Sequence, residues 1–269
     1  MTLTTLVTLV EPDEPAAVEA ALATPFVLAE SFSAALTALV FPIEAEGVAA
    51  ATTDRDPTSA EASAVARVRA LADRRALLCD IRSRSSFAYG VGEVFADHLR
   101  VSDLGVFNWR HDQGQARRLV LHAAIFDSGR PVMIVPEGRP LLAPPSRIVL
   151  AWDATPAAVR AAHGALPFIR RAAETIVVTV TDDKELRAGQ SGIELTHLLA
   201  RHGATARFSA ARRGSGTALE AILATARSTK AELLVMGGVR HAPLHNMIFG
   251  SATQDLLDRG PQLATIVAA

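Results

Sequence analysis

Cysteine is almost missing from the sequence, because Cys79 is the only one among 269 residues. A lone cysteine cannot form an internal disulfide, and no Cys/His cluster has the spacing of zinc ligands. We therefore expect a protein of a reducing compartment without a structural metal, in which Cys79 is an ordinary buried residue. Aromatic residues are also scarce, at 5% of the chain against 49% apolar residues. The core must be built mainly from Ala, Val, Leu and Ile.

Excess charge and long hydrophobic runs are missing as well. The net charge of -1 gives no general attraction to nucleic acid or to an anionic membrane. No run approaches the ~18 apolar residues of a membrane span, and the start "MTLTTLVTLVEP" lacks the basic head and cleavage site of a signal peptide. We expect a cytoplasmic protein without nucleic-acid or membrane partners, so that any partner must be inferred from a site.

The common catalytic signatures do not occur either. The chain has no G-x-S-x-G elbow, no P-loop G-x-x-x-x-G-K-[ST] and no Ser-Gly-Gly-x-Asp-Ser loop of ATP pyrophosphatases. Their absence argues against a serine hydrolase and a standard NTPase. His241 and His245 have no carboxylate or cysteine at catalytic or ligand spacing, which is typical of loop histidines. No catalytic residue is predicted.

What the sequence does contain is an internal repeat. The stretch "VTLVEPDEPAAVEAA" (7–21) aligns without gaps on "IVLAWDATPAAVRAA" (148–162), which places Pro12 opposite Asp153. Two later pairs of segments also match, namely 103–109 with 232–238 and 125–136 with 256–268. Between the copies lies the proline-rich "PEGRPLLAPPS" (136–146), which has no helix or strand period. We expect two domains, residues 1–140 and 141–269.

Within each copy, short apolar runs alternate with helical patterns. Helix starts are indicated by the capping-box spacing in three pairs, Thr58 with Glu61, Ser191 with Glu194 and Thr217 with Glu220. The predicted strands of the first copy lie at 4–10, 36–43, 76–81, 104–109 and 131–135, and those of the second at 147–152, 175–180, 204–209, 232–237 and 263–268. Alternating strands and helices predict two tandem α/β domains, each a five-stranded parallel sheet with helices on both faces.

Ligands of such sheets bind outside the carboxyl ends of the strands, where the strand order reverses. In the second copy Asp153 follows strand one, Val180 ends strand two, and "GGVRHAPLHNMIFGSAT" (237–253) follows strand four. Gly250, Ser251 and Thr253 open the next helix, whose N-terminal amides attract anions. Two simpler interpretations stay open, because Ser and Thr also cap helices without a ligand and an Asp often serves in a turn.

These residues resemble the universal stress protein family, in its tandem two-domain type. Nucleotide-binding members carry, after strand four, a glycine, two residues, a second glycine, nine residues, and then glycine followed by Ser or Thr. The stretch "IVLAWDATPAA" is similar to the family's opening strand with its nucleotide-contacting Asp. The resemblance implies a Rossmann-type fold like that of the adenine nucleotide alpha hydrolases, with ATP bound in the C-terminal domain. The implied contacts are Asp153, Val180, Gly237, Arg240, Gly250, Ser251 and Thr253.

Arg240 stands where the family has its second glycine. A glycine there permits positive φ and close approach of the backbone to the ligand, which a side chain would obstruct. An arginine can also fold over the phosphates and bind them in a bidentate way. The first copy has Pro12 opposite Asp153 and no glycine pair after its fourth strand, so it is expected to be a degenerate domain with a structural role.

Two functions remain open at this stage. The first is a stress-response regulator that binds ATP in the C-terminal domain without significant turnover, with slow hydrolysis through Asp153 left open. The alternative is a nucleotide-free scaffold or small-metabolite sensor. Single-domain members of the resembled family dimerise through their last strand. The tandem chain is therefore expected to form an intramolecular pseudo-dimer, and another face stays available for a homodimer.

Overall fold

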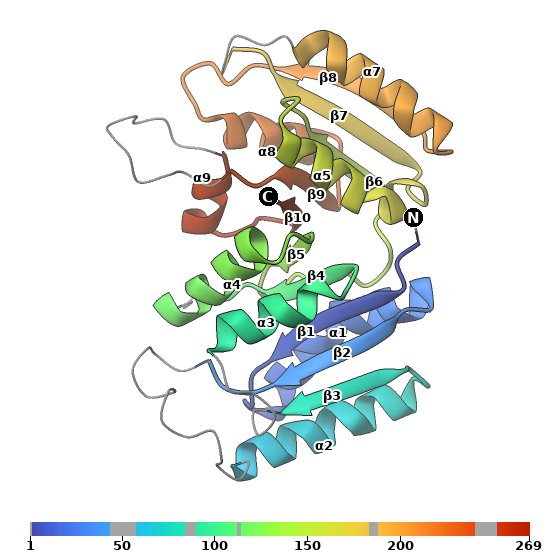
Figure 1. Ribbon diagram of the computed structural model, residues 1–269. Coiled ribbons are helices and arrows are strands. Elements are labelled where there is room, and N and C mark those ends of the chain that lie inside the picture. Colours follow the sequence, from blue (N-terminus) through green and yellow to red (C-terminus); the bar gives the residue numbers. More distant parts are fainter. Residues whose placement is uncertain (1, 44–57, 84–89, 112–113, 183–187, 240–251) are drawn as a thin grey trace. The chain divides into compact units, whose positions relative to one another are not determined.

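The computed structural model describes residues 2–43, 58–83, 90–111, 114–182, 188–239 and 252–269. The chain divides into two compact units, Thr2–Ala143 and Pro144–Ala269. Each unit is an α/β fold with five parallel strands and helices on both faces of its sheet (Figure 1). The fold class expected from the sequence is therefore confirmed.

In the N-terminal unit the strands follow the order β3-β2-β1-β4-β5. Helices α1 and α2 pack against each other, as do α3 and α4. The strands are β1 (Thr5–Val10), β2 (Ala35–Val40), β3 (Cys79–Ser83), β4 (Leu104–Asn108) and β5 (Val132–Val135), and the helices are α1 (Pro15–Phe32), α2 (Ser59–Arg74), α3 (Val91–Arg100) and α4 (Gln115–Asp127).

The C-terminal unit repeats this plan with the strand order β10-β9-β6-β7-β8. Its strands are β6 (Arg147–Ala151), β7 (Glu174–Val180), β8 (Ala206–Ala211), β9 (Leu233–Gly237) and β10 (Ala264–Ala268), and its helices are α5 (Pro156–Gly164), α6 (Leu166–Ile169), α7 (Ala188–Arg201), α8 (Ala218–Ser228) and α9 (Ala252–Arg259). In each unit the order reverses beside the first strand, between β1 and β4 or between β6 and β9. None of the helices in the described ranges is long and apolar enough to cross a membrane.

Two of the three predicted capping boxes are present. Thr58 with Glu61 caps α2, and Thr217 with Glu220 caps α8, each with both reciprocal hydrogen bonds. The prediction for Ser191 is wrong, because α7 already begins at Ala188. The Ser191 hydroxyl instead accepts a hydrogen bond of 3.0 Å from the indole Nε1 of Trp152.

Cys79 opens the edge strand β3 and is half-buried rather than fully buried as expected. Burial, followed by the negative charges of Asp80 and Asp73, raises the pKa of its thiol to about 11. A thiol with such a pKa stays protonated at neutral pH, and the thiolate is the nucleophilic form. This environment agrees with an unreactive cysteine.

The repeat is visible in one carboxylate contact that both units share. Asp103, just before β4, accepts hydrogen bonds from the backbone N–H groups of Thr4 and Thr5 at 2.9 and 3.0 Å. Glu232, just before β9, accepts them in the same way from Ser146 and Arg147 at 2.5 and 3.0 Å. In each unit, one acidic side chain thus fixes the start of the first strand beside the fourth.

The strand register shifts the sequence alignment by one residue. Trp109 N donates to Val135 O and Gly238 N donates to Ala268 O, both at 2.7 Å, so the residues before them, Asn108 and Gly237, are equivalent. Two residues earlier on these strands, Val106 pairs with Thr8 and Val235 pairs with Leu150. Three residues beyond Thr8 and Leu150 stand Glu11 and Asp153.

Glu11 therefore occupies the place of Asp153, and the gapless pairing of Pro12 with Asp153 is wrong. The physical reason is the length of the connection between strand and helix. In the N-terminal unit the four residues 11–14 lie between the last ladder residue, Val10, and α1. In the C-terminal unit Trp152 still belongs to the ladder, because its N donates to Val178 O, so only the three residues 153–155 lie before α5.

We predict that Asp103→Ala lowers the free energy of unfolding by about 2 kcal/mol at neutral pH, because backbone and hydroxyl donors of Thr4 and Thr5 lose their acceptor. Burial opposes ionisation of Asp103, but these hydrogen bonds outweigh it and hold the pKa of the carboxyl below its ordinary value of 3.8. The stabilisation is therefore present above that value and is lost as the pH falls through the lower folded-state pKa. Urea unfolding of both proteins over the acid range measures this difference.

Asp103→Asn is the matched control, because it keeps one oxygen acceptor and removes the charge. It should cost less than the alanine variant, and its difference from the alanine variant should not change with pH. A gap between the parent protein and Asp103→Ala that stays constant down to about pH 2 would contradict the assigned role of the carboxylate.

Candidate functional site

Three predicted site residues lie at the carboxyl ends of neighbouring strands of the C-terminal unit. Asp153 follows β6, Val180 ends β7 and Gly237 ends β9, and β6 lies between the other two. The topology thus brings these residues to one edge of the sheet, at the reversal of strand order where ligands of such folds bind. Arg240, Gly250 and Ser251 lie outside the described residues.

Asp153 forms a tight turn between β6 and α5. Its Oδ1 accepts hydrogen bonds from the backbone N of Thr155 at 3.1 Å and from the Thr155 hydroxyl at 2.6 Å. The turn holds Ala154 at φ 60°, a left-handed conformation that is strained for a residue with a Cβ. Thr155 then caps α5 by accepting from Ala158 N. The turn-residue interpretation of Asp153 therefore has a structural basis.

Gly237 is fixed by the close approach of helix α5. A Cβ atom on this residue would lie 2.6 Å from the backbone N of Ala158 and 2.8 Å from the carbonyl carbon of Ala157. Both atoms belong to the backbone of the first turn of α5, so neither can move away alone. The glycine that the sequence marks as a ligand contact is thus also required for packing the helix on the end of β9.

Thr253 joins the two ends of the segment that follows β9. It lies in the first turn of α9 with only 2% of its surface exposed. Its hydroxyl donates to Gly237 O and accepts from Val239 N, both at 3.2 Å. The described residues on either side of 240–251 are therefore held together by one side chain. Contact of Thr253 with a phosphate stays a prediction.

Trp152 is a site residue that the sequence interpretation missed. It stands between β6 and Asp153, and its indole Nε1 donates to Ser191 in the first turn of α7. Its carbonyl O accepts from the hydroxyl of Thr179 at 2.9 Å. These contacts hold α7 over the ends of β6 and β7, next to Val180. The only feature of the sequence that could have indicated this role is the position of Trp152 directly before Asp153.

A comparison with protein-family models matches residues 145–267 to the model described as the universal stress protein family. These residues form a universal stress protein domain. The match covers the C-terminal unit, which we call the Usp domain from here on. No curated protein gives a significant sequence match.

Solved structures resemble the whole chain. One is the crystal structure of a universal stress protein from Archaeoglobus fulgidus DSM 4304, with a TM-score of 0.67 and 18% identity over 97% of this chain and 95% of that one. Another is the crystal structure of a functionally unknown protein from Pseudomonas aeruginosa PAO1, with a TM-score of 0.60 and 15% identity over 99% of this chain and 92% of that one. At these identities the likeness establishes the fold.

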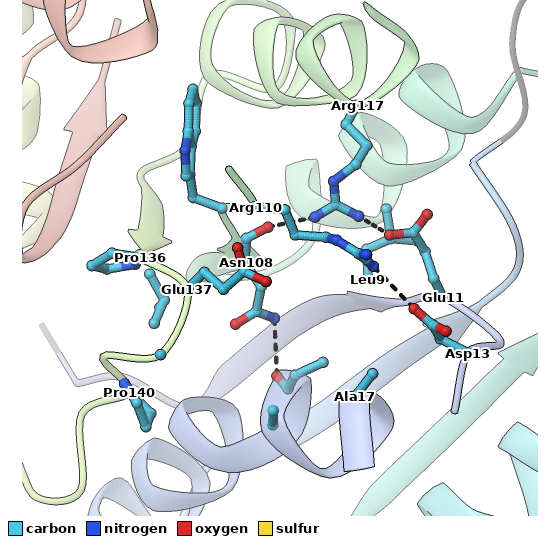
Figure 2. A pocket seen from close by; sticks show the side chains of 15 residues that line it. Leu9, Glu11, Asp13, Ala17, Asn108, Arg110, Arg117, Pro136, Glu137 and Pro140 are labelled. Atoms are coloured by element: carbon cyan, nitrogen blue, oxygen red, sulfur yellow. Dashed lines mark hydrogen bonds and ion pairs between the residues drawn. The ribbon is translucent and has the colours of Figure 1, made fainter. Parts of the chain in front are cut away.

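The N-terminal unit differs from the Usp domain at the residue that corresponds to Gly237. That residue is Asn108, whose side-chain Nδ2 donates a hydrogen bond of 2.9 Å to the carbonyl O of Ala21 in α1 (Figure 2). The helical partner of this carbonyl would be the N–H of residue 25, which is a proline inside the helix and has no N–H to give. Asn108 therefore supplies the donor that Pro25 lacks. Its side chain also separates α1 from the end of β4.

A pocket of about 190 Å³ lies beside this contact, at the carboxyl ends of β1, β4 and β5 (Figure 2). Most of its wall is apolar, and three carboxylates and two guanidinium groups line it as well. The lining residues are Leu9, Glu11, Asp13, Ala17, Ala20, Ala21, Asn108, Trp109, Arg110, Arg117, Val135, Pro136, Glu137, Gly138 and Pro140. The sequence predicts only a structural role for this unit, and no sequence pattern indicates the pocket.

Arg117, in the first turn of α4, is the most buried of these charges, with 13% of its side chain exposed. It forms an ion pair with Glu11 and donates to Asn108 O, and its guanidinium lies 5.1 Å from the ring centroid of Phe107. Burial lowers the pKa of Arg117 to about 10, against the opposing effect of Glu137. The group is still a cation at neutral pH. Glu11, the counterpart of Asp153, is thus neutralised from inside the protein.

A second ion pair lies at the opening of the pocket. Arg110 Nη1 is 3.0 Å from Asp13 Oδ2. A hydrogen bond from the backbone N of Glu14, followed by the one from Arg110, lowers the pKa of Asp13. The third carboxylate, Glu137, accepts a hydrogen bond of 3.0 Å from the backbone N of His111. The pocket therefore has apolar walls and a charged opening.

We predict that Gly237→Ala destabilises the Usp domain by about 1–3 kcal/mol, because the new methyl group would overlap the backbone of α5. Urea unfolding followed by circular dichroism measures the loss. The matched control is Gly92→Ala in α3, where a Cβ would lie 3.4 Å from the Ala123 Cβ, an ordinary contact distance. The control should be neutral or slightly stabilising. Equal effects of the two substitutions would show that the helix contact at Gly237 is not tight.

Proposed function

We propose that the protein is a stress-response regulator whose Usp domain binds an adenine nucleotide, ATP, without significant turnover. The family match of residues 145–267 supports the stress-response role. The nucleotide proposal is carried by the contacts of Gly237, at the end of β9, with the start of α5 and, through Thr253, with the start of α9. Gly237 packs α5 against the end of β9, and Thr253 holds the start of α9 to the same point.

Because of these contacts, the start of α9 lies next to the carboxyl end of β9. Gly250 and Ser251 directly precede Ala252, where α9 begins, and backbone N–H groups at such a position bind phosphates. Asp153 and Val180 lie at the ends of the two neighbouring strands, on the side proposed for the ribose and base. Arg240 falls in the same segment, as a clamp or an obstruction of the phosphates.

Binding without hydrolysis is supported by the state of Asp153. A hydrolytic site needs a group that positions water or a metal ion. Asp153 Oδ1 is engaged by both donors of Thr155, which favours a turn role. We therefore propose ATP as a ligand that reports on the state of the cell.

A second candidate function is the sensing of a small metabolite by the N-terminal unit. The observation that favours it is the pocket beside Asn108, which the Usp domain cannot form at the corresponding place because Gly237 brings α5 onto the strand. The cytoplasmic location, the intramolecular pseudo-dimer and the homodimer stay predictions.

ATP binding is tested by titration of a protein with one tryptophan. The chain has two tryptophans, so Trp109→Phe leaves Trp152 as the reporter next to Asp153. We predict that ATP changes the Trp152 emission and releases heat in calorimetry, and that acid extraction of freshly purified protein yields adenine nucleotide. An empty site after extraction, together with no heat on ATP addition, would contradict the proposal.

Arg240 variants show how the nucleotide is held. If Arg240 clamps the phosphates, Arg240→Gly weakens ATP binding about tenfold or more, because bidentate contacts to phosphate are lost. If Arg240 obstructs the segment, the same change strengthens binding. Arg240→Lys is the control that keeps the charge without the planar fork. ATP hydrolysis measured on the same proteins should stay at background.

A further inference from the structure

We propose that the pocket of the N-terminal unit binds a small organic amine in its ammonium form, with the apolar part against the alanine face of α1 and the charge at the carboxylates. This site is independent of the nucleotide site proposed for the Usp domain. Three features of the unit favour such a ligand: the separation of α1 from β4, the size and apolar walls of the pocket, and the charges that line it.

The space for the pocket arises from the position of α1 relative to β4. In the Usp domain the backbone of α5 lies so close to β9 that no Cβ fits at Gly237. In the N-terminal unit Asn108 stands at that place and bridges to Ala21 O. The helix is held off the strand by the length of an asparagine side chain, and the small side chains of Ala17, Ala20 and Ala21 do not refill the gap.

The volume of the pocket limits the size of the ligand. A pocket of about 190 Å³ is smaller than the roughly 300–1,000 Å³ of pockets that hold drug-sized ligands. A nucleotide does not fit in it. A molecule of about ten non-hydrogen atoms with one apolar part does, since Leu9, Val135 and the prolines 136 and 140 line the pocket together with the alanines.

The charged residues that line the pocket determine which ligand charge it favours. The lining residues include three carboxylates and two guanidinium groups. Each guanidinium is already engaged by a carboxylate, Arg117 by Glu11 and Arg110 by Asp13. The third carboxylate, Glu137, accepts from the backbone N of His111, and its charge acts on Arg117 as well. Three carboxylates and two guanidinium groups leave the lining with one excess negative charge. An ammonium group completes this balance, whereas an anion would compete with existing ion pairs.

The test uses three probes of one shape and different charge: benzylammonium, benzyl alcohol and benzoate. Trp152→Phe leaves Trp109, which lines the pocket, as the only tryptophan and therefore the reporter. We expect benzylammonium to change the Trp109 emission with a dissociation constant of about 0.1–1 mM, which corresponds to an ordinary binding free energy per atom for such a small ligand. Benzyl alcohol should bind about tenfold more weakly and benzoate not at all.

Two variants distinguish the contribution of the pocket's charge to binding from the contribution of its space. Glu137→Gln keeps an oxygen that can accept from His111 N and should weaken benzylammonium binding about tenfold, while leaving benzyl alcohol unaffected. Ala17→Leu adds carbon atoms to the wall and should abolish binding of both. Glu93→Gln, on α3 and outside the lining residues, changes the net charge equally and should have no effect. Urea unfolding verifies that each variant is folded.

Several results would overturn the proposal. Binding of benzoate with equal or higher affinity would mean that the guanidinium groups select the ligand. Equal binding of benzylammonium to Glu137→Gln and the parent protein would remove the role of the carboxylate. No emission change with any probe up to about 10 mM would mean that the pocket holds only water. Loss of ATP binding in the Usp domain would not affect these outcomes, since the two sites have separate reporters.

Discussion

The contact between the end of the fourth strand and the first turn of the helix after the first strand determines what each unit can hold. In the Usp domain this contact is direct, because Gly237 has no side chain and the backbone of Ala157 and Ala158 occupies the space. The adjacent turn through Asp153 and Thr155 is then short and internally hydrogen-bonded. The segment after β9 starts from a fixed point, and Thr253 ties its far end to the same place.

In the N-terminal unit the same contact runs through a side chain. Asn108 reaches Ala21 O, the carbonyl that Pro25 leaves without a helical partner. The longer connection from β1 places Glu11 where the other unit has Asp153, and Arg117 neutralises it. One exchange at the end of a strand thus turns a closed helix contact into a small pocket with its own charges. The two copies share a fold and differ in the space at the end of the fourth strand.

Much of this architecture could be predicted from the sequence, because alternating apolar runs and helical spacing act locally. The strands and the capping boxes at Thr58 and Thr217 follow from such patterns. Ser191 shows their limit, since the capping spacing occurs inside α7 and its hydroxyl serves Trp152 instead. The pocket could not be predicted, because it depends on a distance between α1 and β4 that is set by Asn108 and Pro25, residues far apart in the sequence. The one-residue shift that places Glu11 opposite Asp153 also required the register of the sheet.

We infer that the residue at the end of the fourth strand controls the position of the helix that follows the first strand. The most direct measurement is a crystal structure of the Asn108→Gly variant. Our account predicts that α1 moves toward the end of β4 and that the pocket beside Ala17 and Ala21 closes, as the corresponding space is closed at Gly237. A variant structure with α1 in its original place and the pocket unchanged would contradict the account.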